Sequence, residues 1–292
     1  MRLLQFALAA LSLATIGRAQ APSEKAAAPV ARHYVGFDAN EYPGDDLLPA
    51  LRKQFSFTGY WLTNPPGADH NPWTGKRDIL LRTGFGFLVV ANGRLDKEIL
   101  ASRKSGKSPA ALGREDAAAA VVAAQREKFP ARTVLFLDQE EGGRMLPEQA
   151  DYLLAWTEAV AGSSYRAGVY ASGQPVPDGT GPNGKPATIT TIQDVRQHVV
   201  AGHLHEIAFW VAQDACPPAP GCVVQTAKPL APDLSGTLDA TAWQYAQSPR
   251  RKSITQACGA TYNRDGNCYA AGLTQYELDL SVSASPDPSH GR

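Results

Sequence analysis

The stretch that decides the fold is Thr133-Val-Leu-Phe-Leu-Asp-Gln-Glu-Glu-Gly-Gly143, in which an apolar run leads into acidic residues and two glycines. A run that is apolar on both faces is typical of a buried parallel strand. Because side chains alternate along a strand, we expect Asp138 and Glu140 on one face and Gln139 on the other. Two carboxylates at the end of a strand suit acid/base or glycosidic chemistry, although Asp and Gly are also common in solvated turns.

Seven other short segments have the apolar or β-branched composition of strands: Tyr34–Asp38, Phe57–Leu62, Gly84–Val90, Arg166–Ala171, Glu206–Val211, Ala240–Tyr245 and Tyr276–Leu280. Helices are predicted up to about Gln54, over Arg114–Lys128 and Pro147–Ala161, and around Ile192–Ala201, while residues 173–186 are expected to form a loop. Strands that alternate with helices predict a parallel α/β barrel.

The predicted alternation of strands and helices ends late in the chain. Residues 214–239 and 246–275 contain Cys, Pro and Gly but no helical period. We therefore expect an irregular TIM-like barrel, with helices after the early strands and long loops after the sixth and seventh. The alternative is an open doubly wound sheet, but Gly84-x-Gly86 lacks the third glycine of a dinucleotide-binding loop.

The ends of the chain differ in composition from the rest. Residues 1–19 have one arginine, an apolar run and then Gly17 and Ala19, which predicts a signal peptide cleaved after Ala19, with an uncleaved anchor as the alternative. Residues 20–32 are expected to be a flexible lead-in, 33–282 the barrel domain and 283–292 a disordered tail. The protein is therefore predicted to be secreted or periplasmic, with no membrane association after cleavage.

Charge and cysteine content exclude several kinds of site. Lys plus Arg and Asp plus Glu both number 28, so the formal net charge is zero and nucleic acid is not an expected partner. The four cysteines do not have zinc-ligand spacing, and no metal or other cofactor is expected. In an oxidising compartment, two local disulfides are predicted, Cys216 with Cys222 and Cys258 with Cys268.

In a barrel, the strand ends meet at one mouth, so the polar residues there can be predicted. The candidate catalytic residues are Asp38, Asp138, Glu140 and Asp279, with Glu277 as an alternative to Asp279. The candidate substrate-binding residues are Tyr60 (or Trp61), Tyr170, Trp210, Gln213, Trp243 and Gln244. Acids mixed with aromatic rings suit a sugar site. A strand-end Asp is also a common turn or cap residue, and the tryptophans could belong to the core.

The order of these motifs resembles a secreted glycoside-hydrolase-like domain of unknown function that is related to the family 25 muramidases. The resemblance runs from Tyr34 to Asp279 and is carried by Gly36-Phe-Asp38, Tyr42-Pro-Gly44, Gly59-Tyr60, Trp73-x-Gly75, Asp138-x-Glu140, Gly168-Val-Tyr170, Trp243-Gln244 and Asp279. It implies five strand–helix units followed by three strands with few helices. It also implies that Glu140 is the general acid and that Asp138 steers an N-acetyl group or stabilises positive charge.

One departure concerns the residues after the first-strand acid. Muramidases usually follow this Asp with a serine and then a glutamine, whereas here Ala39-Asn-Glu-Tyr42 follows Asp38. The leading hypothesis is a secreted glycosidase that acts on a peptidoglycan-like polysaccharide, at a β-1,4 bond next to an N-acetylated sugar, with substrate assistance as an option. The alternatives are a hydrolase of another glycan and a non-catalytic glycan-binding or cell-envelope protein on the same barrel.

Overall fold

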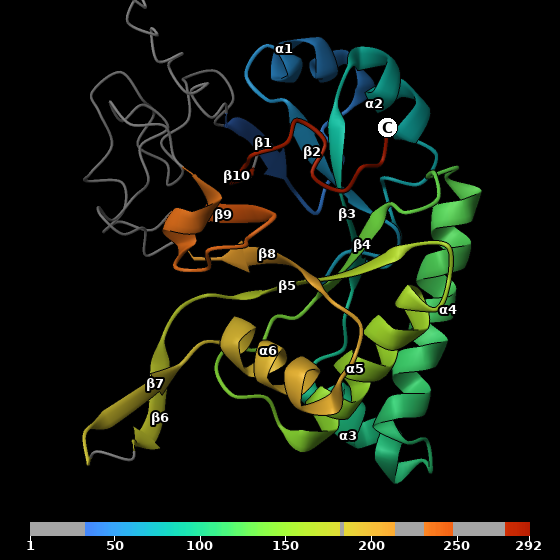
Figure 1. Cartoon of the computed structure of the whole chain (residues 1–292). Coiled ribbons are helices and arrows are strands. Elements are labelled where there is room, and N and C mark those ends of the chain that lie inside the picture. The colour runs from blue at the N-terminus through green and yellow to red at the C-terminus, as the bar shows by residue number, and fades with distance from the viewer. Residues whose placement is uncertain (1–32, 182–183, 214–230, 248–277) are drawn as a thin grey trace, which may run out of the picture. The chain divides into compact units, whose positions relative to one another are not determined.

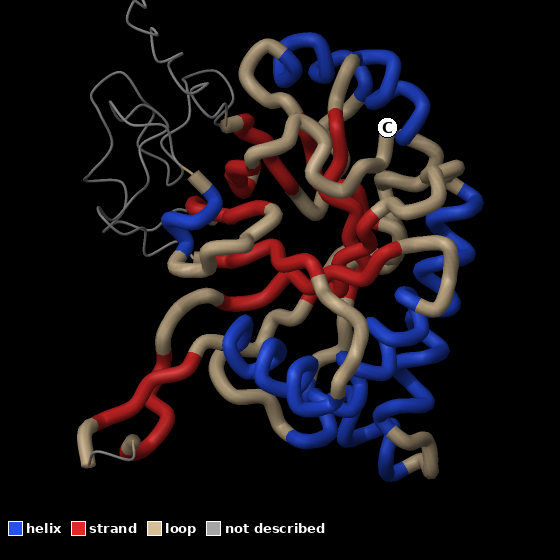
Figure 2. Tube along the Cα trace, viewed as in Figure 1, coloured by secondary structure: helices blue, strands red, loops and turns tan. Residues whose placement is uncertain are grey.

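The computed structural model describes residues 33–181, 184–213, 231–247 and 278–292. Within these ranges, eight strands close into a barrel in the order β1-β10-β9-β8-β5-β4-β3-β2 (Figures 1 and 2). The strands are β1 (Tyr34–Asp38), β2 (Phe57–Trp61), β3 (Gly86–Asn92), β4 (Val134–Asp138), β5 (Arg166–Ser172), β8 (Ala208–Ala212), β9 (Ala242–Ala246) and β10 (Asp279–Ser283). The prediction of an irregular TIM-like α/β barrel is confirmed.

The direction of the last strand differs from the prediction. Strands β1 to β5, β8 and β9 pair in parallel, but β10 is antiparallel to both of its neighbours, β1 and β9. The expectation of an all-parallel barrel was therefore wrong at its closing strand. Apolar composition identifies a strand without fixing its direction, and parallel neighbours need a crossover, usually a helix, for which residues 246–275 show no period.

Helices follow each of the first five barrel strands (Figure 2). They are η1 (Asp45–Leu47) with α1 (Leu48–Arg52), α2 (Arg77–Thr83), α3 (Asp96–Lys104) with α4 (Pro109–Arg126), α5 (Pro147–Ala161) and α6 (Thr191–Gly202); the 3-10 turn η2 (Pro232–Ser235) precedes β9. Helix α5 has the predicted ends. Helix α4 starts earlier than predicted, behind a Ser108 cap, and includes Gly113, where a Cβ would come within 2.2 Å of Tyr152 O on α5.

Residues 173–186, predicted to be a loop, contribute to a two-stranded sheet. Strands β6 (Val176–Thr180) and β7 (Pro186–Ile189) pair antiparallel and form the arm that projects from the barrel in Figure 1. Arg144 anchors this arm, because its guanidinium donates to Asp178 of β6 at 2.6 and 3.0 Å and to the buried Asp194 of α6 at 2.8 Å. Its Gly and Pro content suggested a loop, but Gly181 and Gly184 lie between the two paired strands, where Gly184 N donates to Gly181 O at 3.0 Å.

The predicted disordered tail is instead packed under the barrel, at the end where β3 and β4 begin. Ser289 is fully buried: its N–H donates to Phe87 O, its Oγ accepts from Val89 N, and its carbonyl accepts from Val134 N, at 2.8–2.9 Å. Arg77 also donates to Gly291 O at 2.7 Å. The tail therefore satisfies backbone groups at the strand starts, which its Pro- and Ser-rich composition does not reveal.

This packing predicts a stabilising role for Ser289. Replacing Ser289 by Ala leaves the buried Val89 N–H without its acceptor, so the free energy of unfolding should fall by about 1–3 kcal/mol. Denaturant unfolding measures the change. Ser105→Ala, at an exposed turn after α3, is the control. Equal stabilities of the two variants would show that the tail does not support the barrel.

Candidate functional site

The four candidate acids meet at the carboxyl end of the parallel strands. Asp38 and Asp138 end β1 and β4, and Glu140 follows Asp138 on the same face. Asp279 begins β10 and is paired with Asp38, so the antiparallel direction of β10 brings this first residue to the same mouth. All four line one cavity of about 220 Å³, together with Trp61, Tyr170, Trp210 and Gln244. No Lys, Arg or His is among the described residues that line it.

Asp138 is the least compensated of these acids. Its side chain is 3% exposed, and no nitrogen or hydroxyl donor of the described residues reaches either of its oxygens. Burial, the charge of Glu140, a hydrogen bond to the Glu140 carboxyl and the charge of Asp38 raise its pKa well above the ordinary value. Two carboxyls this close in a poorly solvated cavity do not ionise independently, so Asp138 and Glu140 titrate as a coupled pair in which the neutral form is favoured.

The pKa of Glu140 is also raised, chiefly because its carboxyl is partly desolvated within the cavity although the residue as a whole is exposed, and further by the charge of Glu141, while hydrogen bonding with Asp138 opposes the rise. The roles of Glu140 as the acid and Asp138 as the ionised partner stay predictions; the raised pKa of Glu140 agrees with them, whereas the raised pKa of Asp138 favours its neutral form. The prediction considered the strand position of Asp138 but not its full burial, which favours the neutral form. Glu141, excluded from the chemistry, points elsewhere and accepts from Asp96 N at 2.9 Å.

Asp38 is held by a chain of hydrogen bonds across the barrel. Tyr170 donates to Gln244 Oε1 at 2.7 Å, and Gln244 Nε2 donates to Asp38 Oδ2 at 3.0 Å. The other Asp38 oxygen has no donor among the described residues. Burial, Asp279 and Glu140 raise the pKa of Asp38 well above its ordinary value, against the effect of the Gln244 bond. Tyr170 therefore orients Gln244, and Gln244 orients the carboxyl.

Two tryptophans contribute the apolar part of the cavity. Trp210 lies edge-on to Tyr170, with ring centroids 4.7 Å apart, and its Nε1 donates to Ser281 Oγ at 3.1 Å. Trp61 donates from Nε1 to Ala39 O at 3.1 Å and lines the cavity beside Asn40. Of the Tyr60/Trp61 alternatives, Trp61 is thus the one at the site. Asn40 and Gln247, which also line the cavity, were not among the predicted residues.

Three predicted substrate-binding residues lie outside the cavity. Tyr60 is fully buried on the outer face of β2, where its hydroxyl donates to Glu127 Oε2 at 2.6 Å. Trp243 is fully buried on the outer face of β9 and donates to Gln213 O at 2.8 Å, while Gln213 Nε2 donates to Gly173 O at 3.0 Å. The structure therefore does not bring these three residues to the acid-lined cavity. For Tyr60 and Trp243 the reason is that alternate residues of a strand face opposite sides, and Trp61 and Gln244 take the inner one.

The family of the chain follows from its sequence. Residues 61–260, more than half of the chain, match the family described as the Rv2525c-like, glycoside hydrolase-like domain. The chain belongs to this family. The matched residues include Asp138, Glu140 and Tyr170 of the cavity. No curated protein matches the sequence.

Solved structures with a similar fold include an uncharacterized protein of B. stearothermophilus, the Tat-secreted protein Rv2525c of Mycobacterium tuberculosis and the spore cortex lytic enzyme SleM of Clostridium perfringens. Their sequence identities are 19%, 12% and 14%, and each has a TM-score of 0.49. The alignments cover 86%, 87% and 87% of this chain and 95%, 96% and 68% of the respective structures.

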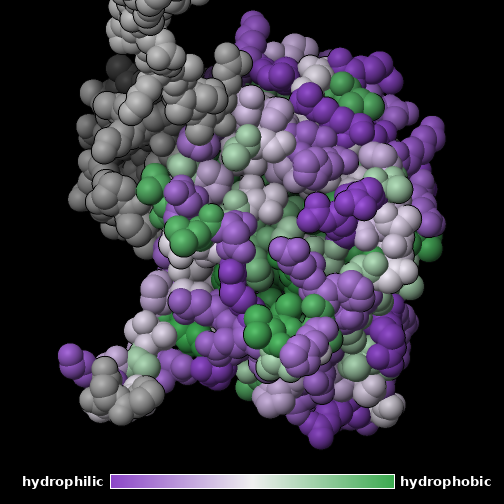
Figure 3. Space-filling model, viewed as in Figure 1, coloured by the Kyte–Doolittle hydropathy of each residue, from purple (hydrophilic) through white to green (hydrophobic). Residues whose placement is uncertain are grey.

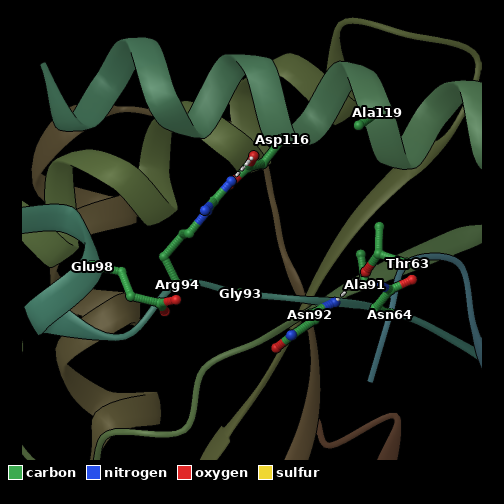
Figure 4. A pocket seen from close by; sticks show the side chains of 9 residues that line it. All are labelled: Thr63, Asn64, Ala91, Asn92, Gly93, Arg94, Glu98, Asp116 and Ala119. Atoms are coloured by element: carbon green, nitrogen blue, oxygen red, sulfur yellow. Dashed lines mark hydrogen bonds and ion pairs between the residues drawn. The ribbon is translucent and has the colours of Figure 1, made fainter. Parts of the chain in front are cut away.

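The Rv2525c-like domain has a further polar pocket of about 310 Å³, between α4 and the loops after β2 and β3 (Figure 4). Arg94 donates to both Asp116 oxygens at 2.8 and 2.9 Å, as the dashed line in Figure 4 indicates. Glu98 accepts from Leu95 N at the start of α3. Because these charges are already paired, this pocket lacks the uncompensated groups that distinguish the acid-lined cavity.

The remaining predictions concern the cysteines, Glu277, metal binding and the membrane. The four cysteines and Glu277 lie outside the described residues. Among the described residues, no group of three or more His, Cys, Asp and Glu side chains could hold a metal ion, and none of the helices has the length and apolarity that crossing a membrane requires. The face shown in Figure 3 is mostly polar, with apolar residues in separate small groups.

The burial of Asp138 predicts a pH-dependent effect on stability. Its folded-state pKa is raised, so the native protein binds the proton more tightly than the unfolded chain, and stability is lost as pH rises above the unfolded value of about 3.9. Asp138→Asn should therefore raise the free energy of unfolding at pH 7 by about 1–3 kcal/mol, with little change at pH 3.5. Urea unfolding at both pH values measures this. The exposed Asp151→Asn is the control, and a destabilised Asp138→Asn at pH 7 would contradict the protonation scheme.

Proposed function

We propose that this protein is a secreted glycoside hydrolase that cleaves a peptidoglycan-like cell-wall glycan next to an N-acetylated sugar. The observation that carries the proposal is the pair of Asp138 and Glu140, both with a raised pKa, in an acidic cavity that Trp61 and Trp210 also line. Only the edges of these two rings reach the cavity, since Trp61 is 6% and Trp210 2% exposed, and a pyranose ring can contact these apolar edges while the carboxyls reach its glycosidic bond. Family membership and the resemblance to muramidases support this class of substrate, and the signal-peptide pattern of residues 1–19 supports secretion.

The spacing of the pair favours a substrate-assisted reaction. Asp138 and Glu140 are two residues apart at the end of one strand and share its inner face, which places both carboxyls on one side of the cavity and not on opposite faces of a bound sugar. Asp138 therefore cannot attack from the face opposite Glu140. An N-acetyl group on the substrate can supply the nucleophile instead, through its carbonyl oxygen.

In this proposed mechanism, Asp138 and Glu140 hold one proton between them, on Asp138 before binding, and this proton moves as the substrate binds. The acetamide N–H of the substrate donates to Asp138, which passes its proton to Glu140 and becomes the carboxylate. Glu140 then protonates the glycosidic oxygen as the bond from that oxygen to the anomeric carbon breaks, and the acetamide oxygen bonds to the same carbon. The Asp138 carboxylate stabilises the resulting cation. Water then attacks the anomeric carbon as the bond from that carbon to the acetamide oxygen breaks, which restores the N-acetyl group, and the water gives its proton to Glu140.

Replacing Glu140 by Gln tests the assignment of the general acid. Glutamine has nearly the same shape but cannot donate the proton, so the release of reducing ends from purified peptidoglycan should fall by about 10²–10⁴-fold with an unchanged unfolding midpoint. Glu148→Gln, which alters an ion pair with Arg103 on the helices, is the matched control. Unchanged turnover in Glu140→Gln would refute the role of Glu140.

The same digest separates hydrolysis from the alternative of a glycan-binding protein without turnover, for which the departure after Asp38 is the supporting feature. Saturable binding of peptidoglycan fragments by the unaltered protein, with no new reducing ends by mass spectrometry, would favour the binding protein.

The raised pKa values predict the pH profile of turnover. The reaction needs a protonated acid, so the rate falls as pH rises through the pKa of the acid in the pair. Because both pKa values of the pair are raised, kcat/KM should persist well above the ordinary glutamic acid pKa of about 4.3 before it declines. Rates measured on soluble glycan fragments from pH 3 to 9 test this, and a decline centred near pH 4 would contradict the shared-proton account.

A further inference from the structure

We infer that Glu140 lies between two sugar-binding subsites and that a second cavity, lined by Gly142, Ser172, Gln174 and Gln247, holds the sugar on the leaving-group side. The inference rests on the proposed hydrolysis for its assignment of the two sides. It names the residues that select the leaving-group sugar, which neither the family nor the similar structures assign.

The geometry shows two adjoining cavities rather than one. The acid-lined cavity and the second cavity each have a volume of about 220 Å³, and they share Glu140, Tyr170 and Gln247 as lining residues. Each is smaller than the roughly 300–1,000 Å³ of sites for drug-sized ligands, so each suits a single ring of an oligomer. A chain of two sugars can therefore occupy both only if it passes Glu140.

The distribution of charge assigns the two sides. Asp38, Asp138 and Asp279 line only the first cavity, whereas Glu140 lines both. Positive charge develops on the sugar whose anomeric carbon reacts, so this ring belongs beside the additional carboxyls. A general acid must touch the bridging oxygen between the two sugars, and Glu140 is the carboxyl of the described residues that borders both cavities.

The lining of the second cavity indicates an uncharged, hydroxyl-rich ligand. Apart from Glu140 and the Tyr170 phenol, its polar side chains are amides and a serine hydroxyl, with Gly142 and Ala212 as small neighbours. Amides and hydroxyls can both donate to and accept from sugar hydroxyls and an N-acetyl group. Gln247 also donates to Gln244 Oε1 at 2.8 Å and to Tyr170 OH at 3.2 Å, which connects this cavity with the residues that orient Asp38.

The wall of the second cavity is fixed before a ligand binds. Ser172 ends β5, and its Oγ accepts from Gln174 N at 3.1 Å, which holds the turn into β6. On the opposite side, Gly143 N donates to the Thr191 hydroxyl at 2.8 Å. Both segments are thus tied to the barrel and α6, so the cavity does not depend on a rearrangement of these residues.

Gly142 offers a way to fill this cavity alone. A Cβ built on Gly142 would meet only the Ser172 side chain, at 3.8 Å, which is an ordinary contact, and the residue has no positive φ that would resist a side chain. A leucine there would extend between Gly142 and Ser172, into the second cavity. None of the residues confined to the acid-lined cavity is altered.

Binding to proteins that also carry Glu140→Gln, which prevents turnover, tests the inference. The probes are an N-acetylglucosamine monosaccharide and a peptidoglycan-derived tetrasaccharide, measured by calorimetric titration. The parent should bind the tetrasaccharide at least tenfold more tightly than the monosaccharide. Addition of Gly142→Leu should weaken tetrasaccharide binding at least tenfold and change monosaccharide binding less than twofold, and Gln174→Ala should act in the same direction more weakly. Ser105→Leu, which adds the same side chain at an exposed turn, should change neither.

Each other outcome has a definite meaning. Equal weakening of both ligands by Gly142→Leu, or unchanged tetrasaccharide binding, would overturn the second subsite. Selective weakening of tetrasaccharide binding by Gly142→Leu, together with no cleavage of peptidoglycan by the unaltered protein, would refute the proposed hydrolysis and support the second subsite. Failure of the parent to bind either ligand would overturn both.

Discussion

The constraint on which the site depends is the crowding of carboxyls in a cavity that has no basic side chain among its described lining residues. Like charges in a poorly solvated cavity repel one another strongly, and protonation of a carboxyl removes one of these charges. Asp138 is almost fully buried, and no nitrogen or hydroxyl donor of the described residues reaches its oxygens, so its ionised form is the least stabilised. The raised pKa values of Asp38, Asp138 and Glu140 are therefore one collective property.

The barrel imposes this crowding through the direction and register of its strands. Parallel strands place Asp138 and Tyr170, which are register partners, at the same mouth. Because β10 is antiparallel, its first residue, Asp279, lies at the same mouth as Asp38 and Asp138, which are the last residues of their strands. At the opposite end, the packed tail satisfies backbone groups of β3 and β4. Polar groups are thus hydrogen-bonded at the base of the barrel, while some carboxyl oxygens at the mouth have no such donor.

Much of this arrangement could be predicted from local sequence. The apolar run before Asp138 fixes β4, and alternation along the strand places Asp138 and Glu140 on one face. Helix α5 could be predicted from Pro147 onward because its start signal is local. That Asp38 and Asp138 lie at the same mouth could be predicted only from a barrel, and the succession of strands and helices predicted that barrel.

The parts that sequence could not give are those set by distant contacts. The direction of β10 depends on its partners β1 and β9, and the order of the tail depends on hydrogen bonds to Phe87, Val89 and Val134. Tyr60 and Trp61 are adjacent aromatics, so which of them faces inward depends on the register of β2 in the closed barrel. The raised pKa of Asp138 follows chiefly from burial, which no local pattern encodes.

The central claim, that Asp138 and Glu140 titrate as a coupled pair in which the pKa of Asp138 is raised, can be tested by NMR titration of ¹³C-labelled side-chain carboxyls. Asp138→Asn and Glu140→Gln provide the assignments. The account predicts that the Asp138 carbon keeps the chemical shift of a protonated carboxyl well above the ordinary range of Asp and that its titration is coupled to that of Glu140. An Asp138 carboxyl that ionises independently, near pH 4, would contradict it.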